Sequence, residues 1–130
     1  MMTDPISDML NRMRNAILRR YDFVDVPLSK IKQNIARIFK EEGFVQNIET
    51  VTEGGHPVLR IKLKYVNEQP LITGMRRISR PGRRVYVGKD EIPRVRGGLG
   101  MAVVSTPQGM MTDQESRKRQ VGGEIICYIW

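Results

Sequence analysis

Few residues in this sequence could carry out covalent chemistry. Cys127 is the only cysteine and His56 is the only histidine, and one such pair cannot supply the ligands of a zinc site at normal spacing. Cys127 lies in an apolar segment, where we expect a buried structural thiol. Ser105 has no plausible base near it in the sequence, although folding could bring one. The sequence therefore predicts no catalytic site, no metal and no cofactor, and the protein is not expected to be an enzyme.

A different kind of chemistry is suggested by "MAVVSTPQGMMTD" at residues 101–113. An apolar run ends at two hydroxyl residues, Ser105 and Thr106, and Pro107, Gln108 and Gly109 follow, which predicts a turn. Hydroxyl groups both donate and accept hydrogen bonds. An uncharged hydroxyl loop at the end of a strand could therefore recognise polar groups at close range.

The net charge restricts the class of partner. Twenty-two Lys and Arg oppose 14 Asp and Glu, which gives +8, and this excess favours a polyanionic partner. Nucleic acid is the partner that the charge favours most, and an anionic membrane surface is the second. The alternative is a soluble protein that is basic without such a partner. A single cysteine fits a reducing compartment. We expect no signal peptide and no membrane span, because no apolar stretch approaches the ~20 residues that a span needs.

The first half predicts two helices and three strands. A helix is expected to begin at Asp4 and Pro5 and a second one at Ser29, because Asp and Ser cap helices and Pro suits a first turn. Strands are expected at 23–26, 44–51 and 59–65. The last of these alternates between apolar residues and three cations, Arg60, Lys62 and Lys64. We therefore expect both helices on one face of the sheet and a basic opposite face.

The second half predicts short strands and one short helix. Strands are expected at 71–79, 84–87, 101–105 and 124–130, and Pro81-Gly82 predicts a type II turn. Thr112 and Glu115 match a capping box, so a helix is expected at 113–119. The predicted fold class is α+β. It has an N-terminal α-β-α-β-β domain at 1–66, a linker at 67–72 and a β-rich C-terminal domain with one short helix at 73–130.

Four blocks of sequence resemble a known family. "DPISDMLNRMRNA" at 4–16, "SRPGRRVYVGKDEIP" at 79–93, "GLGMAVVSTPQGMMTD" at 98–113 and "GGEIICYIW" at 122–130 are similar to the bacterial small-ribosomal-subunit protein family numbered eight. The resemblance covers the whole chain with the blocks in the family's order. It implies an N-terminal α/β domain and a C-terminal β-rich domain.

The resemblance also implies a function. Members of the family bind the central domain of small-subunit ribosomal RNA early in assembly and help to build the platform region. Their expected neighbours are the small-subunit proteins numbered five and two. The implied location is the small ribosomal subunit of the cytoplasm, with an organellar ribosome left open. The alternative function is translational repression, through binding of the protein's own operon messenger RNA by the same surface. A membrane-surface protein is a third interpretation, and no membrane partner is expected.

The resemblance assigns RNA-facing residues by position. In the family, the loop that matches 105–109 lies against a widened minor groove, where RNA is read through its shallow groove and 2′-hydroxyls. This chain has Pro107 and Gln108 where the family usually has Ser and Lys, which puts a hydrogen bond of the family in question. The predicted RNA-binding residues are Ser105, Thr106, Pro107, Gln108, Gly122, Gly123, Glu124, Arg84, Tyr86, Arg14, Asn15 and Lys30.

Six of these assignments, in three groups, have specific reasons and open alternatives. Glu124 is expected to accept a hydrogen bond from a base amino group or a loop hydroxyl, since phosphate would repel an unpaired carboxylate. A plain strand-edge glutamate is the alternative. Arg84 and Tyr86 are expected two apart on one strand face, where Tyr86 could stack on a base or belong to the core. Arg14, Asn15 and Lys30 are the phosphate and sugar candidates, and a solvated helix surface is the alternative for the first two.

Overall fold

The computed structural model describes residues 3–130, and it divides into two compact units. One unit is Pro5–Thr73, and the other is Gly74–Trp130 together with Thr3 and Asp4. Both units combine helices with antiparallel sheet, so the predicted α+β class is confirmed.

The N-terminal unit has the predicted α-β-α-β-β order. Ser29 caps its second helix, because the Ser29 hydroxyl accepts a hydrogen bond from the Lys32 backbone N–H at 3.2 Å. The second helix ends before Gly43, whose positive φ of 80° favours glycine. The elements are α1 (Pro5–Leu18), β1 (Phe23–Pro27), α2 (Lys30–Glu41), β2 (Val45–Glu53) and β3 (His56–Leu63).

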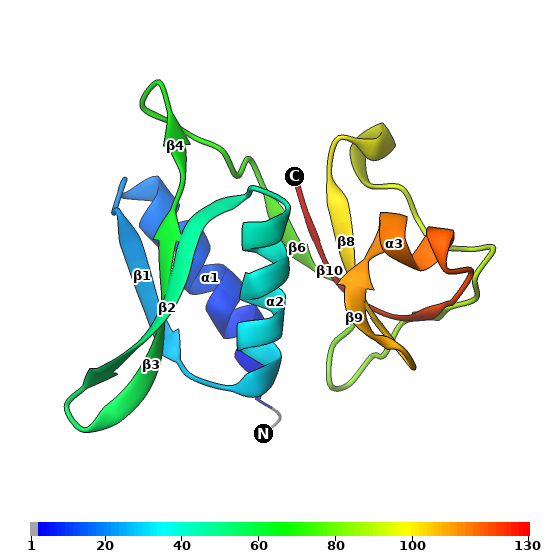
Figure 1. The fold of residues 1–130 in the computed structure, drawn as a ribbon, viewed down its shortest axis with the longest axis horizontal. Helices are drawn as coiled ribbons and strands as arrows, with labels where there is room; N and C mark the ends of the chain where they lie inside the picture. Colours follow the sequence, from blue (N-terminus) through cyan, green and yellow to red (C-terminus); the bar gives the residue numbers. More distant parts are fainter. Residues whose placement is uncertain (1–2) are drawn as a thin grey trace. The chain divides into compact units, whose positions relative to one another are not determined.

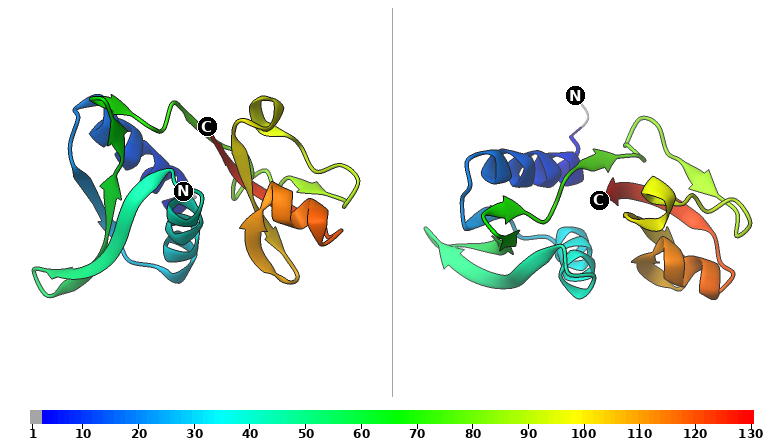
Figure 2. Two further views of the ribbon diagram at one scale, coloured as in Figure 1. Left: turned by 45° about the horizontal axis from the view of Figure 1, so that its top comes forward. Right: turned by 90° about the horizontal axis from the view of Figure 1, so that it is seen from above.

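The three strands form an antiparallel sheet in the order β1-β3-β2. Alternate residues of the central strand are buried on one face, and both helices lie on this side of the sheet, as Figures 1 and 2 show. Leu59, Ile61 and Leu63 of β3 pack there with apolar side chains of the two helices. Fully buried members of this core include Met9, Leu10, Met13, Ile35, Phe39, Leu59 and Ile61.

A small hairpin follows the sheet, where the sequence predicts part of a linker. β4 (Tyr65–Val66) pairs with β5 (Gln69–Pro70). Asn67 and Glu68 form the turn, and both have positive φ, 51° and 66°. Positive φ at both central residues is the pattern of a type I′ turn. Asn tolerates this conformation well, whereas Glu rarely adopts it.

The C-terminal unit is built around one long strand, β10 (Gly123–Ile129). On one edge β10 pairs with β8, and β8 pairs with β9; on its other edge β10 pairs with β6 and β7. The remaining elements are β6 (Met75–Arg77), β7 (Tyr86–Val87), the 3₁₀ helix η1 (Val95–Gly98), β8 (Met101–Thr106), β9 (Gly109–Thr112) and α3 (Asp113–Lys118).

One core cluster holds this sheet against the η1 loop. Ala102, Val104 and Ile125 are buried together with Val95, and partly buried side chains pack around them. The helix α3 begins as predicted, because the Thr112 hydroxyl accepts a hydrogen bond from the Glu115 backbone N–H at 3.1 Å. The Glu115 carboxylate instead binds Arg119 at 2.7 Å, so only this half of the capping interaction is observed.

Two predicted strands are shorter than expected, and one turn is of another type. The segment 71–79 contains only β6, and 84–87 contains only β7. Between them, Arg80 and Arg83 exchange two backbone hydrogen bonds of 2.9 Å around Pro81-Gly82. Gly82 does not have the positive φ that a type II turn requires. The type II prediction is therefore wrong, although the turn itself is present.

Within residues 3–130, none of the helices combines the length and apolar character needed to cross a bilayer.

Candidate nucleic-acid interface

Strand pairing brings predicted residues from three separate segments into one row. Ser105 of β8 lies opposite Glu124 of β10, and Glu124 lies opposite Tyr86 of β7. On the far side of β8, Ser105 lies opposite Met110 of β9. Directly opposed residues point to the same face of a sheet. Met110, Ser105, Glu124 and Tyr86 therefore form a row across four strands, which we call the cross-strand row.

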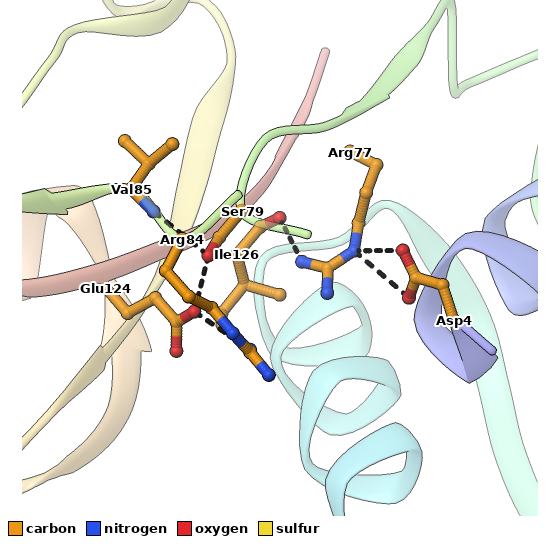
Figure 3. Close-up of polar contacts among 7 residues, drawn as sticks. All are labelled: Asp4, Arg77, Ser79, Arg84, Val85, Glu124 and Ile126. Atoms are coloured by element: carbon orange, nitrogen blue, oxygen red, sulfur yellow. Dashed lines mark hydrogen bonds and ion pairs between the residues drawn. The ribbon is translucent and has the colours of Figure 1, made fainter. Parts of the chain in front are cut away.

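Glu124 is the most constrained member of the cross-strand row (Figure 3). One carboxylate oxygen, Oε2, accepts a short hydrogen bond from the Ser79 hydroxyl and an ion-paired bond from Arg84 at 3.1 Å. The Ser79 oxygen in turn accepts from the Val85 backbone N–H at 3.2 Å. Glu124 is thus not a plain strand-edge glutamate, because its carboxylate is fixed by two donors of the protein itself.

Arg84 and Tyr86 meet Glu124 in different ways. Arg84 precedes β7, so the prediction that these two residues share one strand face is wrong. The chain from the Arg80–Arg83 turn still brings both residues to Glu124, Arg84 through its guanidinium and Tyr86 through strand pairing. Tyr86 is 69% exposed, which rules out the alternative of a core tyrosine. Its ring is open to stack on another flat group.

The hydroxyl loop is a tight hairpin whose two hydroxyls have different surroundings. Thr106 pairs with Gly109 across the β8–β9 turn, and Pro107 and Gln108 are exposed at its tip. The Thr106 hydroxyl donates to the Gly109 carbonyl at 2.7 Å and accepts from the Gln108 N–H at 3.1 Å. Successive strand residues point to opposite faces, so Ser105 faces the cross-strand row while Thr106 closes the turn.

Gly122 and Gly123 have a packing role that the sequence did not indicate. A Cβ on Gly123 would lie 2.2 Å from the Ser105 carbonyl oxygen, and one on Gly122 would lie 2.3 Å from the Val87 carbonyl oxygen. Both distances are shorter than real Cβ atoms show. The two glycines therefore allow β10 to begin between the ends of β8 and β7, next to Glu124.

The three candidates of the N-terminal unit are exposed but do not form one cluster. Arg14 and Asn15 lie on the outer face of α1, where Arg14 donates to Asn11. Lys30 is the first residue of α2, and Figure 1 shows that α1 and α2 begin at the same end of this unit. Lys30 is therefore near the beginning of α1, while Arg14 and Asn15 lie nearer its other end, in the last part of Pro5–Leu18.

Lys32 behaves differently from Lys30, although both are cations in the first turn of α2. Lys32 is buried, and its burial lowers the pKa of the ammonium group. The nearby Asp8 carboxylate of α1 opposes this effect by favouring the charged form. Lys32 thus faces the packing between the helices, and Lys30 alone of the pair remains available to an outside anion.

The basic residues differ in how far their charge is already compensated. Arg117 binds Asp113 at 2.7 Å and Arg119 binds Glu115 at 2.7 Å, so most of the basic run at 117–119, at the end of α3, is paired. Arg80 and Arg83, which flank the Pro81-Gly82 turn, are exposed, and their guanidinium groups have no partner within residues 3–130. Sequence reasoning missed these two as site candidates, although "SRPGRR" places three arginines around one turn.

The open face of the N-terminal sheet is less basic than predicted. The Arg60 guanidinium makes two hydrogen bonds of 2.9 Å to Asp25 and one of 3.1 Å to Glu53, and it also stacks 4.3 Å from the centre of the Phe23 ring. These carboxylates raise the pKa of Arg60 above its usual value. A shallow pocket on this face has Asp22 and Glu49 beside Arg60 and Lys62 in its lining. The two cations in its lining are therefore matched by two carboxylates, and this face is not uniformly basic.

Two further residues near Glu124 were not indicated by the sequence. Ser79 is completely buried, and nothing in the sequence distinguishes its hydroxyl from others. The buried Arg77 donates to the Asp4 carboxylate at 3.1 Å and to the Ile126 carbonyl at 2.7 Å (Figure 3). Arg77 thereby joins the residue before α1 to the middle of β10.

The residues described hold no group of three or more His, Cys, Asp or Glu that could bind a metal ion. What the C-terminal unit does offer is an exposed ring, a free hydroxyl, a fixed carboxylate and uncompensated arginines. This combination is typical of a surface that recognises a polyanion with polar edges, which is a nucleic-acid-binding type of surface.

Comparison with known proteins defines the family. A family model for ribosomal protein S8 matches residues 4–130. Small ribosomal subunit protein uS8 of Caldicellulosiruptor bescii is 56% identical over 98% of this chain and 97% of its own length. The corresponding protein of Thermodesulfovibrio yellowstonii is 55% identical over the full length of both chains, and that of Clostridium novyi is 52% identical over 99% and 98%. The chain therefore belongs to the ribosomal protein S8 family, whose members are ribosomal proteins and not enzymes, so the predicted resemblance is confirmed.

Proposed function

We propose that this protein binds the central domain of small-subunit ribosomal RNA and helps to assemble the platform of the small subunit. The observation that carries the proposal is the cross-strand row, in which Ser105, Glu124 and Tyr86 come from three segments to one face. Family membership supports the choice of ribosomal RNA as the polyanion. In this proposal, residues 73–130 are the RNA-binding domain, 1–66 a second domain and 67–72 the linker.

Each part of the row has a role that suits RNA. The Tyr86 ring stacks on an unpaired base, because stacking needs an exposed aromatic face. The Ser105 hydroxyl, which has no side-chain partner within residues 3–130, bonds to a 2′-hydroxyl or a base edge. Gly122 and Gly123 face the same RNA region and allow β10 to begin beside Glu124, whereas Pro107 and Gln108 contact the RNA backbone from the loop tip.

The cations position the protein on the RNA. Arg80 and Arg83 bind phosphates beside the row, and Arg84 neutralises Glu124 so that phosphate can approach. Arg14, Asn15 and Lys30 contact phosphate or sugar through the N-terminal domain. The protein works in the small ribosomal subunit of the cytoplasm, and its bacterial relatives, which are small-subunit proteins, support this location. Its neighbours there are the proteins numbered five and two.

The test is a calorimetric titration of the full chain with a central-domain ribosomal RNA fragment and with an unrelated RNA of equal length. We expect tight binding to the first and at least 100-fold weaker binding to the second, on the order of the ratios that specific nucleic-acid complexes show. Tyr86→Ala should reduce only the specific binding. Equal affinity for the two RNAs would contradict the proposal.

A further inference from the structure

Glu124 presents only one of its two carboxylate oxygens to the surroundings. Oε2 accepts hydrogen bonds from Ser79 and Arg84, whereas Oε1 has no partner within residues 3–130. Figure 3 shows Oε1 pointing away from both donors. Side-chain exposure of Glu124 is 16%, so this group is largely enclosed and its orientation is restricted.

Ser79 is the fixed point of this arrangement. It has no exposed surface, and its oxygen accepts from the Val85 N–H at 3.2 Å, which leaves the hydroxyl hydrogen for Glu124. Its backbone is held as well, because the Ser79 N–H donates to the Ile125 carbonyl at 3.0 Å. Arg84, by contrast, has a side chain that is 49% exposed and can move. Ser79 therefore determines the direction of the carboxylate, and Arg84 compensates its charge.

We infer that Ser79 is a positioning residue for RNA recognition, which acts through Glu124 and does not touch the RNA. The inference rests on the proposed function. With Oε2 occupied, Glu124 offers a single acceptor, Oε1, on the face that it shares with Ser105 and Tyr86. A carboxylate can only accept. The site therefore selects an RNA group that donates, which is a 2′-hydroxyl or an exocyclic amino group, and rejects a carbonyl or ring nitrogen acceptor there.

The physical reason for this arrangement is the cost of placing a carboxylate near phosphates. A free Glu side chain would turn away from the negative field of the RNA and would lose rotamer entropy on binding. The hydrogen bond from Ser79 fixes the rotamer before RNA arrives. The ion pair with Arg84 makes the local charge neutral. Glu124 then loses little conformational entropy when an RNA donor binds to Oε1.

The experiment is a double-mutant cycle between Ser79 and Glu124. Wild type, Ser79→Ala, Glu124→Ala and the double variant are titrated with the central-domain RNA fragment and with an unrelated RNA. Loss of the Ser79 donor should weaken specific binding about tenfold, as expected when a charge-assisted hydrogen bond is lost. In the Glu124→Ala background the same change should alter affinity less than about twofold, because a coupled pair is non-additive.

Two controls separate positioning from stability. Ser116→Ala removes another fully buried serine hydroxyl of the same unit, which donates to the Val121 carbonyl. It should lower stability but change RNA affinity less than about twofold. Ser79→Ala also leaves the Val85 N–H without its acceptor. If this variant does not fold, Ser79→Cys replaces it, since a thiol of similar size is a weak donor.

A second measurement needs no RNA. Three-bond NMR couplings of Glu124 should report one side-chain rotamer in wild type and averaged rotamers in Ser79→Ala. Unchanged couplings, wild-type affinity of Ser79→Ala, or an equal loss in both Glu124 backgrounds would each overturn the inference. A last outcome is that the couplings change as expected while wild type binds the two RNAs equally. In that case Ser79 does position Glu124, but the proposed binding of central-domain RNA and the selection of an RNA hydrogen-bond donor are both wrong.

Discussion

At the residue scale, the Thr106 hydroxyl is bonded within its own turn, whereas Cys127 is buried as predicted. The Thr106 hydroxyl, expected to face the RNA, closes the β8–β9 turn through its bonds to Gly109 and Gln108. Cys127 lies in the middle of β10, opposite Val103 and Arg77, and is completely buried. Each leads to a prediction about a single side chain.

Removing the Thr106 hydroxyl should loosen the loop. Thr106→Ala loses both hydrogen bonds of the turn, each of which contributes about 1 kcal/mol in typical proteins. We expect specific RNA affinity to fall about fivefold to tenfold, because the loop must be ordered again on binding. Thr106→Ser keeps the hydroxyl and should bind like wild type. Filter binding measures both. Equal weakening by the two variants would mean that the threonine methyl, and not the turn, matters.

The Cys127 thiol should respond to alkaline pH only through unfolding. Burial raises its pKa from 9.0 to about 12, and the nearby Arg77 lowers it only in part. The unfolded thiol therefore loses its proton at lower pH than the folded one. Its contribution to stability is complete below pH 9 and decreases as the pH rises from 9 towards 12.

The measurement is urea unfolding of wild type and Cys127→Ala between pH 8 and 11. The free energy of unfolding of wild type should decrease more steeply above pH 9 than that of the variant. Thiol reagents should modify Cys127 only at the rate of unfolding. Parallel pH curves for the two proteins would contradict the raised pKa.

At the element scale, the close approach of β10 to β8 depends on the absence of a side chain at Gly123. Gly123→Ala would place a Cβ 2.2 Å from the Ser105 carbonyl oxygen, so the strands would have to separate. We expect a loss of about 1–3 kcal/mol in the free energy of unfolding, the usual cost of overpacking. Urea denaturation measures this loss.

Gly88→Ala is the matched control for the same substitution. A Cβ on Gly88 meets nothing within 4 Å, and Gly88 does not have a positive φ. Its stability should remain within about 0.5 kcal/mol of wild type. If Gly123→Ala were equally harmless, the close approach of the strands would not be required for folding.

At the scale of the whole molecule, the basic residues behind the net charge of +8 differ in whether they are free to bind an outside anion. Arginines of α3 and of the open N-terminal sheet face are paired with carboxylates, whereas Arg80 and Arg83 are free of partners in the described part of the chain. The salt dependence of RNA binding should therefore come from particular arginines and not from net charge. The logarithm of the affinity should decrease linearly with the logarithm of salt concentration.

Substitution of Arg83 and Arg119 distinguishes these possibilities. Both variants, Arg83→Gln and Arg119→Gln, lose one charge, but Arg119 is already bound to Glu115 at 2.7 Å. Arg83→Gln should lower the salt slope by about 0.7–0.9, the value for one phosphate contact. Arg119→Gln should leave the slope unchanged. An equal change in both would show that binding responds to net charge alone.

The amino-acid sequence by itself determined the local elements of this protein. Apolar spacing and caps such as Ser29 and Thr112 predict the helices, and alternation predicts β3, because these signals act between residues close in sequence. The family followed from four local blocks. The sequence also supplied three members of the cross-strand row, Ser105, Glu124 and Tyr86, as candidates, but it could not show that they share one face.

The tertiary structure decided which partners the polar groups have. The bonds from Ser79 to Glu124 and from Arg77 to Asp4 join residues 45 and 73 positions apart, and no local pattern specifies them. Strand register decided that Ser105 faces the row while Thr106 turns inward to its own loop, since one step along a strand reverses the face. The tertiary structure also decided which arginines have no carboxylate partner and that Lys32 is buried. The number of charges can be read from the sequence, but pairing and burial of a charge depend on which groups lie near it in the folded protein.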